Sequence, residues 1–366
     1  MKLSCIKNYL LEGFTLVERV IEKNTVLPIL QNVLIKTEKN KLILSATNLE
    51  IGIQVTIAAK ISEEGSLTVP AKVFSSFLSS LPDEKISLQT KGTTVTVSSD
   101  LHRATILGTD VKDFPIIPTI TDGFSFVIPA EVFFSALSSI NFLTAQGDLR
   151  PELGGVFCSF EKETIRMAAT DSFRLGERTI KISEQKNTIK CIIPTKTVSE
   201  LIRVFGGMKE EISLCISANQ FMVKTTEKEL ISRLIEGKYP DYTAIIPTSF
   251  TTTVRVKKED FFQTLRAASI FAGKNHDVKL SISPEEKKCI IESQNNDIGE
   301  HKGHFPCEGN GKTLKVLCNY QYFLEILAKL EDEYISLEGN GENDPLVLKN
   351  TTKSGTVYVV MPLRAY

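Results

Sequence analysis

An alternating strand that runs directly into an amphipathic helix recurs six times along this chain. The clearest copies occupy residues 66–81 (SLTVPAKVFSSFLSSL), 124–140 (FSFVIPAEVFFSALSSI) and 188–205 (TIKCIIPTKTVSELIRVF). The weaker copies occupy residues 2–21, 252–270 and 313–330. Successive copies begin roughly 60 residues apart, and such a period is typical of a repeat architecture rather than of unrelated domains.

Each copy changes its hydrophobic period where the strand meets the helix. In the strand part apolar residues alternate, as at Phe124, Phe126 and Ile128, which predicts one buried face and one open face. In the helix part the apolar residues follow the helical period, as at Val198 and Leu201. Three copies carry proline at the junction, where its fixed backbone angle suits the first turn of a helix.

A second pattern recurs at twice that spacing. The segments KLILSATNLEIG, TIRMAATDSFRLG and KCIIESQNNDIG end on Gly52, Gly176 and Gly299. Proline-rich segments at 113–119 and 239–248 match at a similar spacing and predict linkers. The remaining segments are short and alternating, which favours antiparallel sheets. We therefore expect an α+β fold of three tandem domains, each with two helices on antiparallel sheets: 1–122, 123–247 and 248–366.

Composition excludes several classes of protein. The formal net charge of −1 provides no bulk attraction to nucleic acid or to an anionic membrane. Seven cysteines stand singly among apolar residues and without a C-x-x-C pair, which predicts packed, reduced thiols. The first residues lack a secretory leader, and no apolar run is long enough to span a bilayer. These features predict a cytoplasmic protein.

A metal site is the first candidate chemistry. His301, His304 and Cys307 are the right ligand types for zinc, but their spacing matches no usual finger and a fourth ligand is lacking. We expect a surface loop with incidental histidines there. The segment 309–313 (GNGKT) lacks the first glycine of a phosphate-binding loop and leads into a strand, so we reject that interpretation.

Acid–base catalysis is the second candidate. Asp171 and Glu177 flank Arg174, yet the corresponding positions of the other repeats hold Asn48 and Asn296, which cannot do that chemistry. Asp and Asn side chains that bond their own backbone would build the same turn in all three copies. No other carboxylate cluster, glycine-rich cradle or serine elbow is evident, so we expect no catalysis, no metal and no cofactor.

Basic residues recur on or beside the predicted helices. If the acidic residues lie elsewhere on the surface, a chain with a net charge near zero could still bind a polyanion through these helices. Ordinary solvated helix positions explain the same pattern. The end of the chain, VYVVMPLRAY, allows two interpretations: a strand tucked into a sheet, or a tail in which Met361, Pro362 and Leu363 leave the strand and line a groove.

Eight motifs in order resemble the β subunit of bacterial DNA polymerase III, the sliding clamp family. They are TVLPIL (25–30), ATNLEIG (46–52), TVPAK (68–72), DFP (113–115), ATDSFRLG (169–176), YPDY (239–242), NYQYFLEIL (319–327) and YVVMPLR (358–364). The resemblance covers the whole chain. It implies a head-to-tail homodimer that closes into a ring around double-stranded DNA, a non-catalytic processivity factor opened by a separate loader.

The resemblance also implies partners that bind by short linear peptides: the replicative polymerase α subunit, the clamp loader, other DNA polymerases, and mismatch-repair and ligase proteins. Their groove would lie between the second and third domains. The residues carried over to it are Leu153, Thr170, Ser172, Arg174, Leu175, Pro240, Ile245, Asn319, Tyr322, Val360, Met361, Pro362, Leu363 and Arg364. The family commonly has Gly-His where this chain has Ser172 and Phe173, which predicts a bulkier wall, and Ala365 and Tyr366 extend past the usual end.

Contacts with DNA and between subunits follow from the same resemblance. The expected DNA-binding residues are Lys23, Asn24, Lys72, Arg150, Lys196 and Arg203. The seam between subunits would bring Ala104 and Ile106 of one chain against Ile270 and Phe271 of the other. Two other hypotheses stay open from the residues alone: a hydrolase or metalloenzyme that uses the Asp171 or His301 region, and a repeat scaffold that binds only protein.

Overall fold

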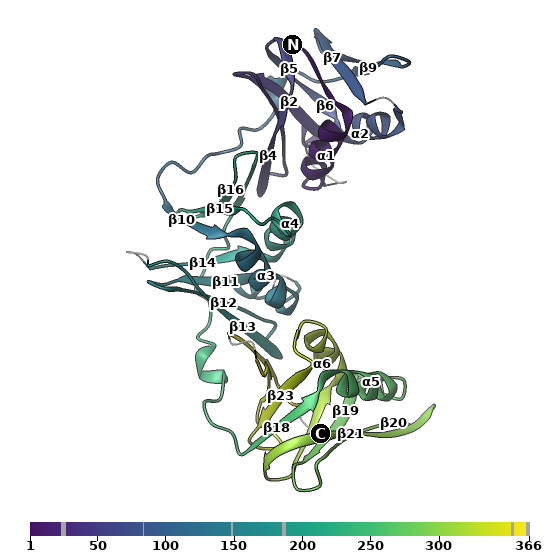
Figure 1. Cartoon of the computed structure of the whole chain (residues 1–366), viewed down its shortest axis with the longest axis vertical. Coiled ribbons are helices and arrows are strands. Elements are labelled where there is room, and N and C mark those ends of the chain that lie inside the picture. The colour runs from purple at the N-terminus through teal and green to yellow at the C-terminus, as the bar shows by residue number, and fades with distance from the viewer. Residues whose placement is uncertain (23–26, 83, 148, 185–187, 353–354, 364–366) are drawn as a thin grey trace. The chain divides into compact units, whose positions relative to one another are not determined.

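The computed structural model describes residues 1–22, 27–82, 84–147, 149–184, 188–352 and 355–363. Within them, every α-helix begins at the residue that follows a strand (Figure 1). The six strand–helix units are β1 (Lys2–Ile6) with α1 (Lys7–Glu18), β6 (Gly65–Pro70) with α2 (Ala71–Ser80), β10 (Phe124–Pro129) with α3 (Ala130–Ile140), β14 (Ile189–Pro194) with α4 (Thr195–Phe205), β18 (Thr252–Lys257) with α5 (Lys258–Ser269), and β22 (Leu314–Asn319) with α6 (Tyr320–Leu327). The predicted sixfold unit is confirmed.

The chain splits into two compact units. The first unit comprises Met1–Phe134 and Lys196–Leu234, and the second comprises Ser135–Thr195 and Ile235–Tyr366. The first unit contains a sheet in the order β5-β1-β7-β8-β9 and a sheet in the order β10-β15-β16-β17-β4-β3-β2-β6. Its further strands are β2 (Asn32–Glu38), β3 (Lys41–Thr47), β4 (Ile51–Ala58), β5 (Lys60–Glu63), β7 (Lys85–Lys91), β8 (Thr94–Ser98), β9 (Arg103–Leu107), β15 (Glu211–Ile216), β16 (Gln220–Lys224) and β17 (Lys228–Arg233).

The second unit contains one long sheet in the order β14-β11-β12-β13-β25-β24-β23-β18-β21-β20-β19-β22. Its further strands are β11 (Gly155–Phe160), β12 (Thr164–Thr170), β13 (Arg174–Lys181), β19 (Asp277–Ser283), β20 (Lys288–Asn295), β21 (Gly299–Gly311), β23 (Tyr334–Gly339), β24 (Leu346–Asn350) and β25 (Thr356–Val360). Every strand pairing in both units is antiparallel, as predicted from the short alternating segments.

Neighbouring repeats share a sheet, and this is why compact units and sequence repeats do not coincide. In the first unit β4 of the first repeat pairs with β17 of the second, with Gly52 opposite Ile231. In the second unit β13 pairs with β25, with Gly176 opposite Tyr358. We call these two pairings the joints. The expected domain boundaries at 122/123 and 247/248 stay predictions.

The joint glycines are required because other side chains occupy the place of a Cβ atom. A Cβ at Gly52 would lie 2.6 Å from Ile117 Cγ2, and one at Gly176 would collide with Leu143 Cδ1. The third glycine of the pattern, Gly299, has another reason: its φ of 130° lies in the left-handed region that glycine tolerates. One sequence signal thus has two physical causes.

Phenylalanine rings join the paired helices. Phe14 of α1 stacks on Phe74 of α2 with ring centroids 4.5 Å apart, and Phe134 of α3 stacks on Phe205 of α4 at 5.7 Å. In the third pair, Phe261 of α5 lies 5.8 Å from Phe323 of α6. Full burial of one such side chain contributes about 1.5–3 kcal/mol, so each ring pair holds its helices firmly.

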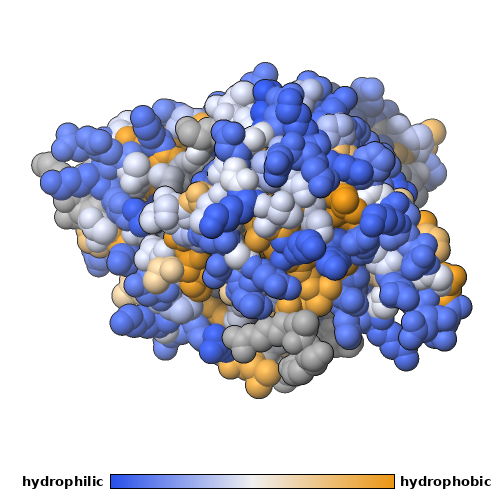
Figure 2. All heavy atoms as spheres, turned by 90° about the horizontal axis from the view of Figure 1, so that it is seen from below, coloured by the Kyte–Doolittle hydropathy of each residue, from blue (hydrophilic) through white to orange (hydrophobic). Residues whose placement is uncertain are grey.

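The seven cysteines are all buried and reduced, which confirms the predicted packed thiols. Burial raises the pKa of Cys5 and of Cys318 to about 12, so these thiols stay protonated at neutral pH. No described helix is long and apolar enough to span a bilayer. On the face in Figure 2, hydrophilic residues predominate and hydrophobic ones gather in small patches.

Candidate functional site

A cavity of about 220 Å³ lies in the second unit, beside the turn that joins β12 to β13. We call it the first groove. Its lining residues are Arg150, Leu153, Thr170, Ser172, Arg174, Leu175, Pro240, Tyr242, Ile245, Val359 and Met361. Eight of these are among the groove residues expected from the sequence, and they come from four separate stretches of chain.

The turn from β12 to β13 is built by its own side chains. Thr170 Oγ1 donates a hydrogen bond to the Arg174 carbonyl at 2.7 Å and accepts one from the Ser172 N–H at 3.1 Å. Asp171 Oδ1 accepts from the N–H groups of Phe173 and Arg174, both at 2.9 Å. Ser172 has a φ of 79°, in the left-handed region where glycine is usual. The predicted role of Asp171 as a turn builder fits these contacts.

Arg174 connects this turn to α6. Its side chain is only 10% exposed; Nε lies 2.9 Å from Asp171 Oδ2, and one terminal nitrogen lies 2.8 Å from Glu325 Oε2. The guanidinium carbon also lies 4.7 Å from the Tyr322 ring centroid and 5.6 Å from that of Phe142. A planar cation with five donors suits a site with both carboxylates and ring faces. Arg174 therefore braces the wall of the first groove as well as lining it.

An apolar cluster lies under the first groove. Its buried members are Leu153, Ala168, Leu175, Ile192, Tyr239, Tyr242, Val347 and Val359. The Tyr242 hydroxyl donates to Glu177 Oε2 at 2.8 Å, and burial, followed by this carboxylate, raises the tyrosine pKa above its usual value. Glu177 is thus engaged as a hydrogen-bond acceptor below the groove. With Asp171 building the turn, neither carboxylate supports the acid–base hypothesis.

The end of the chain combines the two interpretations of the sequence. It is a strand, β25, as far as Val360, and then continues as a tail. The Met361 N–H donates to the Phe173 carbonyl at 2.9 Å, and the Leu363 N–H donates to the Leu317 carbonyl of β22 at 2.8 Å. These bonds hold Met361 at the wall of the first groove.

Five other expected groove residues are described but do not line the cavity: Asn319, Tyr322, Val360, Pro362 and Leu363. The Asn319 side chain caps α6 by accepting from the Gln321 N–H at 2.9 Å. Phe173 is 58% exposed and also lies outside the lining, so the bulkier residue there does not narrow the cavity. Arg364, Ala365 and Tyr366 lie outside the described residues.

Two lining residues, Tyr242 and Val359, escaped the sequence prediction. The period of two along β25 puts Val359 and Met361 on one face and Val360 on the other, so strand alternation could have identified Val359. Tyr242 belongs to the motif YPDY, but only the fold shows that its ring turns back under the groove. Arg150 is also among the lining residues, and the contact with DNA that the resemblance implied for it stays a prediction.

The remaining basic candidates are exposed. Lys72 lies on α2, and Lys196 and Arg203 lie on α4. The Lys196 ammonium is 3.7 Å from Glu22, an exposed pair of the kind that is weak. Arg203 is 2.8 Å from Glu200, whose side chain is only 13% exposed. Lys23 and Asn24 lie outside the described residues.

The expected seam residues lie at two strand edges. In the described part of the chain, β9, with Ala104 and Ile106, pairs with β8 on one side only. The long strand β21 pairs with β20 from Gly299 to Pro306, and it pairs with β18 only from Cys307 onwards. Beside its first half lie Ile270, which is 65% exposed, and Phe271, whose ring is 6.0 Å from that of His301.

The prediction of a surface loop around His301 is wrong, because residues 299–311 form β21. His301 stacks on Phe271, while Cys307 is buried and donates towards the Ser283 carbonyl at 3.9 Å. Burial raises the pKa of the Cys307 thiol, which disfavours the thiolate that zinc needs. Among the described residues no group of three or more His, Cys, Asp or Glu could hold a metal ion.

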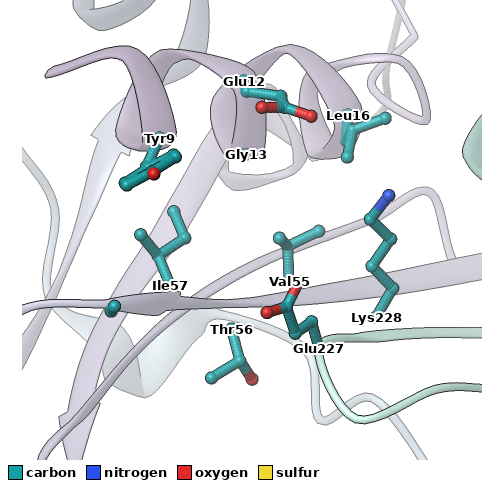
Figure 3. A pocket seen from close by; sticks show the side chains of 10 residues that line it. Tyr9, Glu12, Gly13, Leu16, Val55, Thr56, Ile57, Glu227 and Lys228 are labelled. Atoms are coloured by element: carbon teal, nitrogen blue, oxygen red, sulfur yellow. The ribbon is translucent and has the colours of Figure 1, made fainter. Parts of the chain in front are cut away.

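A larger cavity of about 400 Å³ lies between α1 and the β4–β17 joint (Figure 3). The Glu12 carboxylate approaches it from α1, and Lys228 approaches it from β17. The Lys228 ammonium already donates to the Val204 carbonyl at 3.4 Å. We find no converging set of unused polar groups there, so the first groove remains the stronger candidate.

Comparisons with known proteins cover the whole chain. Family models described as the N-terminal, central and C-terminal domains of the DNA polymerase III beta subunit match residues 1–118, 127–241 and 243–364. The beta sliding clamp of Staphylococcus epidermidis is 26% identical over the full length of both chains. Two solved structures also match over the full length of both chains: the DNA polymerase III beta subunit of Pseudomonas aeruginosa (TM-score 0.96, 25% identity) and the DNA polymerase sliding clamp of Bacillus subtilis (TM-score 0.95, 26% identity).

Proposed function

Because this chain belongs to the DNA polymerase III beta subunit family, the non-catalytic sliding clamps of DNA replication, we propose that two copies close into a ring around duplex DNA. We further propose that the first groove holds short peptides of the partner proteins that the ring tethers. The observation that carries the proposal is the repeated joint: the chain pairs its repeats twice by the same strand-to-strand contact and keeps both halves of a third.

The third joint would form between two molecules. By position in the repeats, β21 corresponds to β4 and β13, and β9 corresponds to β17 and β25. Their edges lack a partner strand in the described part of one chain. A contact between different surfaces of identical subunits closes into a ring when the rotation divides a full turn. Two copies of a threefold repeat would meet that condition.

The register of the existing joint predicts the register of the seam. Ser232 lies opposite Ile51, and Val360 lies opposite Arg174; the corresponding residues at the seam are Ile106 and Gly299. In that register Ala104 lies opposite His301, on the side where Phe271 stacks. Opposite residues of an antiparallel pair share a face, so Ala104 and Ile106 would contact α5 of the partner, next to Ile270 and Phe271.

Substitution at the seam tests this closure. Ile106 is 7% exposed in the single chain, so Ile106→Asp would place a carboxylate in apolar surroundings; it should weaken the dimer about 100-fold, measured by analytical ultracentrifugation, with circular dichroism to check that the subunit still folds. The control is Leu107→Asp, because Leu107 is 74% exposed and points to the opposite face of β9. A monomeric wild-type protein at micromolar concentration, or an Ile106→Asp dimer as tight as the wild type, contradicts the ring.

Peptide binding in the first groove is supported by the character of its walls. Leu153 is 1% exposed and Ile245 is 45% exposed, so apolar surface reaches from the floor to the rim. Thr170 and Arg174 are already engaged in the turn and in ion pairs, so apolar contacts would dominate, which suits an exchangeable ligand of modest affinity. We propose as ligands the polymerase α subunit, the clamp loader, and the other polymerases, ligase and mismatch-repair proteins that carry such peptides.

The tail supplies the test of the peptide site. Met361→Ala combined with Leu363→Ala should abolish the binding of a polymerase-derived peptide, measured by fluorescence anisotropy, and leave the dimer intact. Backbone bonds to Phe173 and Leu317 hold this tail and are kept in the variant, so the fold should survive. Loss of the dimer would instead assign the tail a structural role and remove the peptide proposal.

The protein's contacts with DNA would be to the phosphates alone. Lys72, Lys196 and Arg203 are exposed, and phosphate contacts from such long cationic side chains position a protein on DNA without reading its sequence. Such contacts are weak and sensitive to salt, which allows sliding, and encirclement supplies the retention. A clamp loaded on nicked circular DNA should be lost when the circle is linearised. If linearisation does not change its release, topological binding is wrong.

A further inference from the structure

The first unit contains a second copy of the turn that walls the first groove, between β3 and β4. Thr47 Oγ1 donates to the Ile51 carbonyl at 2.9 Å and accepts from the Leu49 N–H at 3.0 Å. Asn48 Oδ1 accepts from the N–H groups of Glu50 and Ile51 at 3.1 and 2.8 Å. These are the same four bonds that Thr170 and Asp171 make in the second unit, so the two turns have one backbone design.

The middle residue of this second turn is held against its preference. Leu49 has a φ of 76°, close to the 79° of Ser172, although leucine rarely adopts the left-handed region. Its side chain is 48% exposed instead of packing into the core. Strained backbone that presents an apolar side chain to solvent is characteristic of binding sites, where the surrounding structure maintains it.

A cavity of about 300 Å³ lies beside this turn, and we call it the second groove. Its lining residues are Thr47, Leu49, Glu50, Gly52, Pro115, Ile116, Pro118, Gln220, Ile231, Ser232 and Arg233. Ile116 lies at its edge with 93% of its surface exposed, in the proline-rich segment that corresponds to the one carrying Ile245. The Arg233 N–H donates to the Glu50 carbonyl at 3.0 Å, as the Met361 N–H does to Phe173.

The two grooves differ in the side chains of the two residues that this N–H to carbonyl bond joins. Glu50 and Arg233 stand where the first groove has Phe173 and Met361. Both charged residues are exposed, and neither forms an ion pair with another residue in the described part of the chain. The second groove therefore has one negative side chain, Glu50, and one positive side chain, Arg233, next to an apolar patch of Leu49 and Ile116.

We propose that the second groove binds a short extended peptide of a partner protein, with an apolar anchor against Leu49 and Ile116 and opposite charges beside it. An acidic residue of the peptide pairs with Arg233, and a basic residue pairs with Glu50. A cavity of about 300 Å³ accepts a few side chains and not a folded domain. The mixed charge of its walls disfavours a nucleic acid, which needs clustered basic residues. This goes beyond the peptide site of the first groove and selects different peptides.

The experiment uses the full-length protein with Met361→Ala and Leu363→Ala, which remove binding at the first groove. The probe is an array of pentapeptides with a central Leu or Phe and one acidic and one basic residue at permuted positions, each matched by a peptide with Gln at both charged positions. At least one charged peptide should bind about tenfold more tightly than its Gln match. If none does, the proposal is wrong.

Ile116→Ser, a change at a fully exposed position that leaves folding intact, should weaken this binding about fivefold or more. Ile245→Ser, the matched change at the first groove, should leave it unchanged. The exchange Glu50→Arg with Arg233→Glu should reverse the preferred order of charges in the peptide. Binding that survives Ile116→Ser, or an order unaffected by the exchange, overturns the second groove. Failure of the first-groove variants to lose polymerase peptides would instead contradict the proposed function.

Discussion

The β3–β4 turn and the β12–β13 turn share a backbone and differ in what the side chains around it do. Both use a threonine and an Asp or Asn to satisfy the same four backbone groups. Only Asp171 also binds a buried guanidinium, since the residue corresponding to Arg174 is the apolar Ile51. Repetition therefore preserves the geometry of a wall, and substitution on that wall decides what it can bind.

The largest difference between the turns should appear when the Asp or Asn is removed. Asp171→Ala should lower the free energy of unfolding by about 3 kcal/mol, because two backbone bonds are lost and Arg174 loses a partner at low exposure. Asn48→Ala should cost about 1 kcal/mol, because it loses the two backbone bonds and only a long, exposed hydrogen bond to Glu22 besides. Urea unfolding followed by circular dichroism measures both.

Asp171→Asn separates the two contributions, since it keeps the turn and removes the charge. Its loss of stability should lie between those of the two alanine variants. Equal losses for Asp171→Ala and Asn48→Ala would show that the Arg174 brace adds nothing, and the contrast between the turns would then be one of shape alone.

Alkaline pH should distinguish the two regions next. Burial raises the pKa of Tyr239 and of Tyr242 below the first groove, while the residue corresponding to Tyr239 near the second groove is Phe114. A phenol with a raised folded pKa contributes stability that is complete below its unfolded pKa of about 10 and is lost as pH rises above it. The second unit should therefore be destabilised above about pH 10.

Ultraviolet absorbance at alkaline pH, recorded beside circular dichroism, measures this effect. The two tyrosines should ionise only together with unfolding, and Tyr239→Phe should make peptide binding at the first groove less sensitive to pH. Ionisation of all eight tyrosines without loss of structure would contradict the assigned burial.

The smallest effect concerns the left-handed residues of the two turns. Leu49→Gly should raise the free energy of unfolding by about 1 kcal/mol, because glycine adopts this φ without strain. Ser172→Gly should raise it by less, since a small polar side chain strains this conformation less than leucine does. Thermal unfolding of both variants provides the comparison, and a destabilised Leu49→Gly protein would show that the leucine contributes packing rather than strain.

Local patterns in the sequence determined the elements of this protein. Strand alternation, helical periodicity and junction prolines located all six strand–helix units, because each signal arises between residues that are neighbours in the chain. The Asp and Asn turns were identified for the same reason, since Asp171 and Asn48 bond backbone groups only two or three residues away. The family resemblance predicted most residues of the first groove, because a resemblance carries information about long-range contacts and local patterns carry none.

Tertiary structure alone decided how the repeats are joined and what lines the cavities. The shared sheets at Gly52 and Gly176, the brace from Arg174 to Glu325, and the place of Tyr242 under the groove all depend on contacts between residues far apart in sequence. The loop expected at His301 became a strand because β20 and β18 supply partners for its backbone. Periodicity reports which face of an element is buried, but the partner that buries it is chosen only when the chain folds.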